Sequence, residues 1–334
     1  MKKNFFFQTK APLRVSLFGG GTDFENYYNY NDGATISFTI NKFIYTTIKN
    51  HDDKIFSEKI RLNYSESERV NNIKNIKNRI IKQLTNQTKF KKSFYLSTIS
   101  DVPEGTGLGS SSAFITSLIV LLNKLNQNKI SKHQIAKYSY NLEKKKLNMS
   151  VGAQDHFISV YGGFKRISYS KNEIKVQSLD IYKNELNKLL KKIIFIWTGT
   201  TRKASSILSK QDKNIKKNYS HLKKIYETQE IFYKLLKNKL LDYRIFGELL
   251  KESWISKKEL ERGISNNKIE EISLILEKNK SIGFKVLGAG GGGFVMAAFS
   301  EENKKDFEKK FKNKLNIYNF KFYEDGIRFF NMNK

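Results

Sequence analysis

Three glycine clusters, far apart in the sequence, constrain this chain more than any other feature. They lie at 19–21, in VPEGTGLGSSSA at 102–113 and in VLGAGGGGFVMAAF at 286–299, and they hold 11 of the 20 glycines. Glycine has no Cβ, so a glycine loop lets backbone N–H groups come close to a ligand. Several such loops on one chain predict a large polyanion held mainly by backbone, and a nucleoside triphosphate fits.

Length and composition limit the class of protein. With 334 residues the chain is long enough for two ordinary domains, and 39% hydrophobic residues support buried cores. The absence of cysteine excludes disulfides, thiolate metal sites and thiol nucleophiles. No apolar run approaches the roughly 20 residues that span a bilayer, and the apolar part of MKKNFFFQTK is too short for a signal peptide. We expect a soluble cytoplasmic protein.

The net charge is large, because 61 Lys and Arg residues face 32 Asp and Glu residues and leave +29. One interpretation is binding to nucleic acid or membrane. We favour a general lysine bias, because the lysines are spread along the whole chain, whereas a binding face should cluster them and interleave aromatic residues. A positive field would also attract a phosphorylated substrate. We therefore expect a small-molecule substrate, no specific nucleic acid and no membrane partner, and the sequence does not indicate the oligomeric state.

Hydrophobic periodicity and turn residues predict a mixture of helices and strands. In the first half we expect an extended segment at 4–18, a short helix at 24–30 capped by Thr22 or Asp23, and one or two strands at 34–48. Further predicted elements are a lysine-rich helix at 66–91, a strand at 94–99, helices at 113–125 and 131–146, and a hairpin at 164–179.

The second half begins with a polar helical stretch at 179–192 and a strand at 193–197. Helices are expected at 203–213, 217–238, 243–260 and 303–314, with a strand–loop–strand unit at 281–299 and final strands at 317–330. Strands and helices do not alternate regularly, so α+β is favoured over a doubly wound sheet. We place the domain boundary near 185, which gives domains at 1–185 and 186–334.

The middle cluster has the strongest chemical meaning. The loop leads directly into a serine run and an apolar helix, so free N–H groups and the positive end of a helix dipole meet there. It is not a Walker P-loop, because no lysine precedes the serines. The plain alternative is a serine N-cap after a glycine turn. The residues in question are Gly105, Thr106, Gly107, Leu108, Gly109, Ser110, Ser111 and Ser112.

The third cluster contains GxGxxG at Gly288, Gly290 and Gly293, but a Rossmann site is a poor interpretation. The glycines are followed by a strand-like segment instead of a helix, and no acidic residue lies about 20 positions further on. A glycine-rich strand connection, kept small so that something packs against it, is the better alternative.

Taken together and in order, the three clusters resemble the motifs of the GHMP small-molecule kinases. APLRVSLFGGGTD at 11–23 is similar to the first motif of the family, VPEGTGLGSSSAF at 102–114 to the second, and KVLGAGGGGFVMAAF at 285–299 to the third. GGGTD at 19–23 and VGAQDHF at 151–157 resemble the branch that phosphorylates D-glycero-D-manno-heptose 7-phosphate. The resemblance implies a two-domain GHMP kinase-like α+β fold with the active site in the interdomain cleft.

The resemblance also implies that ATP donates its γ-phosphate to a sugar hydroxyl with Mg²⁺ present. The loop at 105–109 would bind the triphosphate, and Ser111 and Glu143 would ligate Mg²⁺, with Ser110 the next candidate. Asp155 would face the acceptor hydroxyl and Arg14 the transferred phosphoryl group. The residues implied to bind the sugar are Asp23, Gly21, Thr22 and Gly291.

Chemistry gives independent reasons for these residue types. A carboxylate can accept the acceptor proton, an arginine can offset developing charge, and hydroxyl and carboxylate oxygens suit Mg²⁺. Each candidate has a plain alternative: Asp155 and Asp23 could be helix caps, Glu143 an exposed helix charge, and Arg14 a strand-edge charge. None of the four histidines has metal-ligand spacing, and His156 is expected beside the site or facing solvent.

Two features bear on the substrate. Gly20 and Gly21 occupy places where galactokinase-like members carry an acidic residue and a histidine, which argues against a galactose specialist. TGTTRKA at 198–204 could contact a sugar phosphate, with Arg202 the first choice for the phosphate and Lys203 the alternative, or it could simply begin a helix. The resulting hypothesis is phosphorylation of the anomeric hydroxyl of the heptose 7-phosphate to the 1,7-bisphosphate. The alternatives are a fucokinase-like sugar kinase and, from another class, a nucleic-acid-binding protein that reuses the fold.

Overall fold

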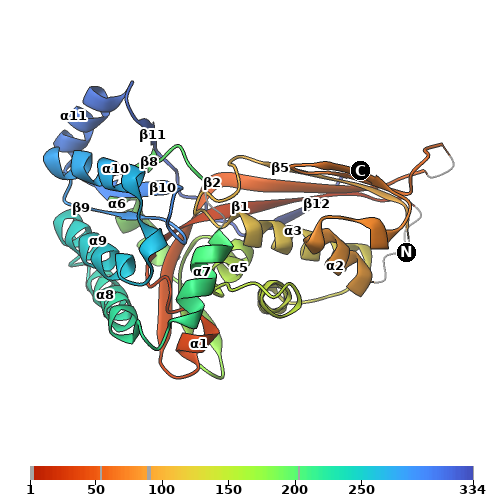
Figure 1. Cartoon of the computed structure of the whole chain (residues 1–334), viewed down its shortest axis with the longest axis horizontal. Coiled ribbons are helices and arrows are strands. Elements are labelled where there is room, and N and C mark those ends of the chain that lie inside the picture. The colour runs from red at the N-terminus through yellow and green to blue at the C-terminus, as the bar shows by residue number, and fades with distance from the viewer. Residues whose placement is uncertain (1–3, 53–54, 89–91, 202–203, 334) are drawn as a thin grey trace.

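The computed structural model describes residues 4–333 except 53–54, 89–91 and 202–203. Within these residues the chain forms two β-sheets, with helices against both (Figure 1). The first sheet extends along the molecule toward the end where both termini lie, and the second sheet lies at the opposite end (Figure 1). This mixture, without regular β–α–β alternation, confirms the predicted α+β class. None of the helices in the described ranges has the length and hydropathy that a bilayer crossing requires.

The first sheet has eight strands, in the order β12-β1-β2-β5-β3-β4, with β6 on β2 and β7 on β6. All its pairs are antiparallel except β3 with β5. Strand β2 joins the two parts of the sheet, because the first half of β2 pairs with β6 and the second half pairs with β5. The strands are β1 (Phe6–Phe18), β2 (Gly33–Asn50), β3 (Ile60–Asn63), β4 (Ser67–Val70), β5 (Phe94–Ser100), β6 (Phe164–Tyr169), β7 (Ile174–Ser178) and β12 (Arg328–Asn331).

Helices α3 and α5 pack against β1 and β2, and α2 and α4 pack against α3. The apolar residues spaced along α3 from Ile115 to Leu125 are buried. This packing fixes the start of α3 and the start of α5 beside β1, where the candidate site lies. The helices of this part are α1 (Glu25–Tyr28), α2 (Arg79–Gln87), α3 (Ser110–Leu125), α4 (Lys132–Asn141), the π-helical turn Leu142–Lys146, and α5 (Gln154–Tyr161).

The second sheet is antiparallel, in the order β11-β8-β10-β9. Its strands are β8 (Ile193–Trp197), β9 (Gly283–Val286), β10 (Phe294–Ala298) and β11 (Asn316–Tyr318). The helices of this part are α6 (Lys183–Leu190), α7 (Ala204–Lys213), α8 (Tyr219–Lys237), α9 (Tyr243–Lys258), α10 (Asn267–Lys278) and α11 (Glu301–Phe311), and short 3₁₀ turns lie at Ile73–Asn75, Asp180–Tyr182 and Arg262–Ile264.

The two sheets share a hydrophobic core through α8 and α9. The Phe18 ring at the end of β1 lies 4.7 Å from the Phe232 ring of α8 and 5.8 Å from the Phe246 ring of α9. Met296 of β10 belongs to the same cluster. Aromatic rings at these distances interact favourably, so this contact holds the second-sheet side against the end of β1.

One prediction of local structure is wrong, and one helix was missed. The segment expected as one helix at 66–91, of which 89–91 lie outside the described residues, is divided. The Glu68 carboxylate accepts the N–H groups of Lys77 at 2.6 Å and Asn78 at 3.0 Å, and α2 begins only after its Asn78 cap. Helix α10 was not expected. The final strands are present, and they separate: β11 joins the second sheet while β12 returns to β1 of the first. The boundary near 185 stays a prediction.

Candidate active site

A buried ion pair joins β1 to α5. Arg14 Nε donates to Asp155 Oδ1 at 2.7 Å and Nη2 donates to Oδ2 at 2.6 Å, a bidentate pair across 141 sequence positions. Arg14 Nη1 also donates to the carbonyl of Gly107 at 2.6 Å. Arg14 is 5% exposed, pairs with β2 on one side and donates its backbone N–H to Leu108 O, so it is not an exposed strand-edge charge. The Asp155 side chain remains 22% exposed and lines the cavity described below.

The middle glycine loop ends at Gly109, which has φ +79°, and α3 begins at Ser110. The N–H groups and positive dipole end of α3 therefore face the loop, which is the arrangement that binds phosphates at helix starts. Thr106 and Leu108 are buried away from the cavity: Thr106 O accepts from Phe294 N, and Leu108 O accepts from Arg14 N. These two residues of the predicted loop hold it in place. The predicted residues that line the cavity are Gly105, Gly107, Gly109, Ser110, Ser111 and Ser112.

Glu143 lies in the π-helical turn with its side chain 1% exposed, so it is not a solvent-facing charge. Its Oε1 accepts from Ser111 Oγ at 3.1 Å, and its Oε2 accepts from Ser112 Oγ at 3.1 Å. His156 Nε2 lies 2.7 Å from the same Oε2, and this histidine is fully buried. The expectation that His156 might face solvent is wrong, whereas its place beside the site is confirmed.

The serine and glutamate oxygens form a donor set that suits Mg²⁺. Ser111 Oγ and Glu143 Oε1 are hydroxyl and carboxylate oxygens that approach each other at the start of the phosphate loop helix. No group of three or more His, Cys, Asp or Glu side chains placed to hold a metal occurs within the described ranges. Mg²⁺ commonly takes only one or two carboxylates and completes its shell with phosphate oxygens and water, so the residues present fit it.

Asp23 is buried at the opposite wall from the serines and also braces α5. Its Oδ1 accepts from Gly21 N at 3.0 Å and its Oδ2 from Gln154 N at 3.1 Å. Burial raises the pKa of Asp23, while the two backbone N–H groups oppose that rise. The prediction that Thr22 or Asp23 caps the short helix α1 is wrong, because the N-cap residue is Phe24 and no side chain makes a capping hydrogen bond.

Of the other residues predicted to bind the sugar, some line the cavity and some do not. Gly21 lines the cavity, whereas Thr22 is fully buried and its hydroxyl donates to Gly19 O at 2.8 Å. Gly291 is not among the cavity residues, and its N–H donates to Ile264 O at 2.7 Å. Arg202 and Lys203 lie outside the described residues.

The third glycine cluster packs directly on the middle loop. A Cβ at Gly288 would lie 2.4 Å from Gly107 Cα, and a Cβ at Gly107 would lie 2.5 Å from Leu287 O. Real Cβ atoms do not come so close, so the backbone contact requires glycine on both loops. The interpretation of this cluster as a connection made small for packing is supported by these contacts.

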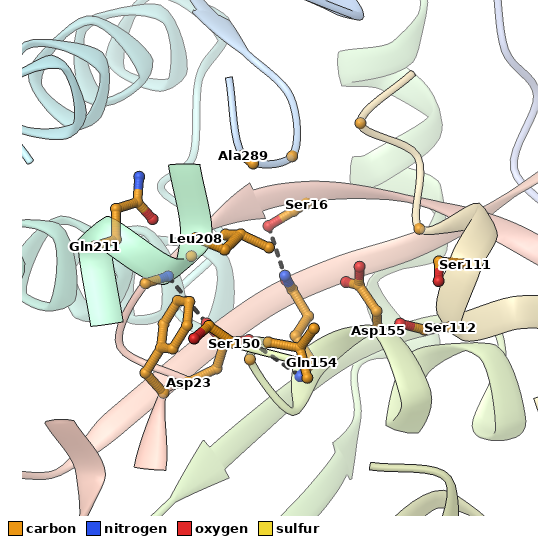
Figure 2. Close-up of a pocket in the computed structure, with 18 of the residues that line it drawn as sticks. Ser16, Asp23, Ser111, Ser112, Ser150, Gln154, Asp155, Leu208, Gln211 and Ala289 are labelled. Carbon is orange, nitrogen blue, oxygen red and sulfur yellow. Dashed lines mark hydrogen bonds between the residues drawn. The ribbon is translucent and has the colours of Figure 1, made fainter. Parts of the chain in front are cut away.

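A cavity of about 460 Å³ collects these groups between the two parts of the molecule. Figure 2 shows Ser111, Ser112 and Asp155 on one side of it and Leu208 and Gln211 of α7 on the other, with Ala289 of the third glycine loop above. Its position between the two parts confirms the predicted cleft location. Two further lining residues, Lys257 of α9 and Lys285 of β9, were missed, although Lys285 is the first residue of the third motif.

A glycine loop at a helix start, an arginine–aspartate pair and a serine–glutamate oxygen pair in one cleft are the kinds of group that phosphoryl transfer requires. Known proteins agree with that chemistry. A match to the GHMP kinases N terminal domain covers residues 73–163, and a match to the GHMP kinases C terminal domain covers residues 232–317. The chain belongs to the GHMP kinase family, and it is an ATP-dependent kinase.

Relatives align with nearly the whole chain. A D-glycero-alpha-D-manno-heptose 7-phosphate kinase of Campylobacter jejuni is 28% identical over 96% of this chain and 98% of its own length. A galactokinase of Thermotoga neapolitana is 23% identical over 96% and 99%. Among solved structures, a D-glycero-D-manno-heptose 1-phosphate kinase from Bacteriodes thetaiotaomicron has a TM-score of 0.79 at 20% identity, covering 98% of this chain and 100% of its own.

Proposed function

We propose that this enzyme transfers the γ-phosphoryl group of ATP to the anomeric hydroxyl of D-glycero-D-manno-heptose 7-phosphate and forms the 1,7-bisphosphate. The family and its full-length sugar kinase relatives make the chain an ATP-dependent sugar kinase. The observation that supports phosphoryl transfer at this site is the bidentate Arg14–Asp155 pair, which lines the same cavity as the glycine loop and the serines.

Asp155 is the proposed acceptor of the sugar proton. Its carboxylate is partly exposed toward the cavity and lies in the first turn of α5, held in one orientation by both Arg14 bonds. A fixed carboxylate can accept or orient the proton of an attacking hydroxyl. The same guanidinium carries a positive charge beside the loop that binds phosphate, where phosphoryl transfer develops negative charge.

Ser111 and Glu143 are the proposed Mg²⁺ ligands, and the loop at 105–109 with the start of α3 is the proposed site of the ATP phosphates. When bound, Mg²⁺ neutralises phosphate charge during transfer. His156 and Ser112 hold the second oxygen of Glu143, so the first oxygen keeps a fixed direction beside Ser111. Partners of this kind orient metal ligands and are costly to lose.

The sugar would lie between Asp23 and Asp155, toward the second-sheet side of the cavity. The choice of heptose 7-phosphate is supported by the Campylobacter jejuni relative, which is named for that substrate. The structural neighbour from Bacteriodes thetaiotaomicron is named for a heptose 1-phosphate, so both are kinases of a heptose phosphate. We propose Arg202 for the phosphate that the substrate already carries, with Lys203 as the alternative.

The test is a comparison of acceptors. Initial velocities are measured by ADP release with heptose 7-phosphate, unphosphorylated heptose, fucose and galactose, each with saturating ATP and Mg²⁺. We expect heptose 7-phosphate to have the highest kcat/KM, and the product to carry its new phosphate on the anomeric oxygen. A better rate with unphosphorylated heptose, fucose or galactose would leave only the sugar kinase class.

A further inference from the structure

Two lysines that line the cavity from the second-sheet side have no ion-pair partner among the residues that the structure describes. Lys257 Nζ, in the last turn of α9, donates to Val286 O at 3.1 Å and also to Gly288 O. Lys285 Nζ, on β9, donates to Leu17 O at 2.8 Å. In the described part of the chain, no ion pair includes either lysine. Among the described residues, the hydrogen-bond acceptors that stabilise their charged form are therefore backbone carbonyls.

Other buried lysines of the chain are treated differently. Lys165 pairs with the Asp180 carboxylate. Lys304 donates to Ile193 O and Asn319 Oδ1, and the charges of Glu308 and Glu301 raise its pKa against the effect of burial. Buried charges are normally paired because an unpaired one costs several kcal/mol, of the order of the loss seen when one partner is removed. Over the described part of the chain, Lys165 thus has the direct carboxylate partner that the lysines at the cavity lack, and Lys304 has two carboxylates nearby without an ion pair.

The charges around Lys257 do not supply that partner. Arg14 of β1 faces Lys257, but it is a cation that already pairs with Asp155. Lys285 of β9 is a second cation close to Lys257. Burial, with Arg14, lowers the pKa of Lys257 to about 7, although Asp23 acts in the opposite direction. Burial, Lys257 and Arg14 also lower the pKa of Lys285. Four other charged residues lie at the end of α9 or just after it. Glu259 is the cap residue of the helix, Lys258 lies over the Trp254 ring, Glu261 pairs with Lys210, and Arg262 lies in the following 3₁₀ turn.

An ammonium group has three hydrogens to donate. Lys257 directs two of them to the carbonyls of Val286 and Gly288, and its side chain is partly exposed at the cavity wall. We propose that Lys257 binds a phosphate oxygen of the ligand with its third hydrogen while the other two hold the third glycine loop. The proposal rests on the proposed function only for the source of that phosphate, which is either the nucleotide or the sugar phosphate.

The same contacts connect Lys257 to the reacting groups. The carbonyl that it holds belongs to Gly288, which packs on Gly107, and the Gly107 carbonyl accepts from Arg14. A phosphate bound at Lys257 would therefore fix the contact between Gly288 and Gly107. That contact positions the Gly107 carbonyl, which accepts a hydrogen bond from the Arg14 guanidinium. Lysine here acts as a binding and positioning residue, while proton transfer stays with Asp155.

This arrangement predicts a link between binding and protonation. A bound phosphate stabilises the charged form of Lys257 and so raises its pKa above the value of about 7 that the free protein has. Below that pH the lysine is already protonated and binding takes up no proton. Above it, binding takes up a proton, and affinity falls by up to about tenfold for each pH unit.

Isothermal titration calorimetry at pH 8, in two buffers of different ionisation enthalpy, measures this proton uptake directly. The probes are Mg·ADP, heptose 7-phosphate and inorganic pyrophosphate. The variants are Lys257→Met, Lys257→Arg, which stays charged, and Lys304→Met as a matched loss of a buried lysine away from the cavity. We expect uptake in the wild type and in Lys304→Met, and none in either Lys257 variant. Lys257→Met should bind at least about tenfold more weakly, a loss of roughly 1.4 kcal/mol.

Each outcome decides one point. Uptake with Mg·ADP alone assigns the lysine to the nucleotide, and uptake with the sugar phosphate alone assigns it to the acceptor. No uptake in the wild type with any probe, or equal uptake in Lys257→Met, would overturn the proposal. If Mg·ADP and heptose 7-phosphate both fail to bind, the proposed function is wrong, and the pyrophosphate titration alone then decides on Lys257.

Discussion

The two sides of the cavity hold their charges in opposite ways. On the first-sheet side Arg14 pairs with Asp155, and Glu143 lies against His156. On the second-sheet side the hydrogen bonds that Lys257 and Lys285 make to the described residues go to backbone carbonyls. The difference indicates two roles. The first-sheet side holds preorganised groups for the reaction, and the second-sheet side holds ammonium groups that can bind anionic ligands.

The largest expected effect comes from breaking the paired side at Asp155. Asp155→Asn should lower kcat by at least about 100-fold while Mg·ADP still binds, because a positioned proton acceptor contributes about 10²–10⁴. Single-turnover kinetics together with ADP titration separates the two effects. Asp212→Asn, which changes a carboxylate that bonds Asn26 outside the cavity, is the control and should turn over normally. Near wild-type turnover in Asp155→Asn would remove it from the proposed role.

The contact between the two sides can be tested at Gly288. Gly288→Ala adds a Cβ at φ +65° that would meet Gly107 Cα at 2.4 Å. Backbone strain of about 1–2 kcal/mol and overpacking of about 1–3 kcal/mol should together lower the free energy of unfolding. Denaturant unfolding measures it.

Gly199→Ala is the matched control for that experiment. Gly199 has φ +78° but nothing within 4 Å of an added Cβ, so it carries the backbone strain without the clash. We expect Gly199→Ala to lose only about 1–2 kcal/mol and to keep the affinity for Mg·ADP, while Gly288→Ala loses both stability and affinity. Equal losses in the two variants would mean that the loop contact contributes nothing.

Sequence could reveal the paired side because its groups stand in local motifs. The serines directly follow a glycine loop, and Asp155 and Glu143 stand at recognisable spacings. What sequence could not reveal is the geometry, since the Arg14–Asp155 bond spans 141 positions and depends on how α5 packs on β1. Likewise, Asp23 bonds the start of α5 instead of its own neighbouring helix.

The role of Lys257 on the second-sheet side could not be predicted from the sequence, for a physical reason. Lys257 stands next to Lys258 in a lysine-rich helix, and no local pattern distinguishes the two. Their difference arises from the face of α9: Lys257 meets the third glycine loop, and Lys258 lies over Trp254. The wrong helix at 66–91 has a similar origin, because Glu68 takes N–H groups of Lys77 and Asn78 only once β4 is placed.

A smaller effect is expected from the proposed Mg²⁺ ligands. Ser111→Ala and Glu143→Gln should each raise the Mg²⁺ concentration for half-maximal rate by about 10–100-fold, the usual range for losses at metal sites. Gln is preferred to Ala at Glu143, because a smaller side chain would leave His156 without its partner in a fully buried place. Mg²⁺ titration of the initial rate is the measurement, with circular dichroism to verify folding. Unchanged titration curves in both variants would exclude this pair as ligands.

The smallest expected effect concerns the end of the cavity where the acceptor would carry its own phosphate. Arg202 follows Thr201, which lines the cavity, and a guanidinium can bind a phosphate with two parallel bonds. Arg202→Ala should raise KM for heptose 7-phosphate by about tenfold, the loss of roughly 1.4 kcal/mol, and leave KM for ATP nearly unchanged. Lys203→Ala tests the alternative: a larger rise in KM for heptose 7-phosphate in this variant than in Arg202→Ala would assign the phosphate to the lysine, which cannot form the bidentate bond. If Arg202→Ala changes KM for neither substrate while Lys257→Met weakens the sugar phosphate, the acceptor's phosphate belongs at the lysines. The second-sheet side would then carry specificity as well as charge.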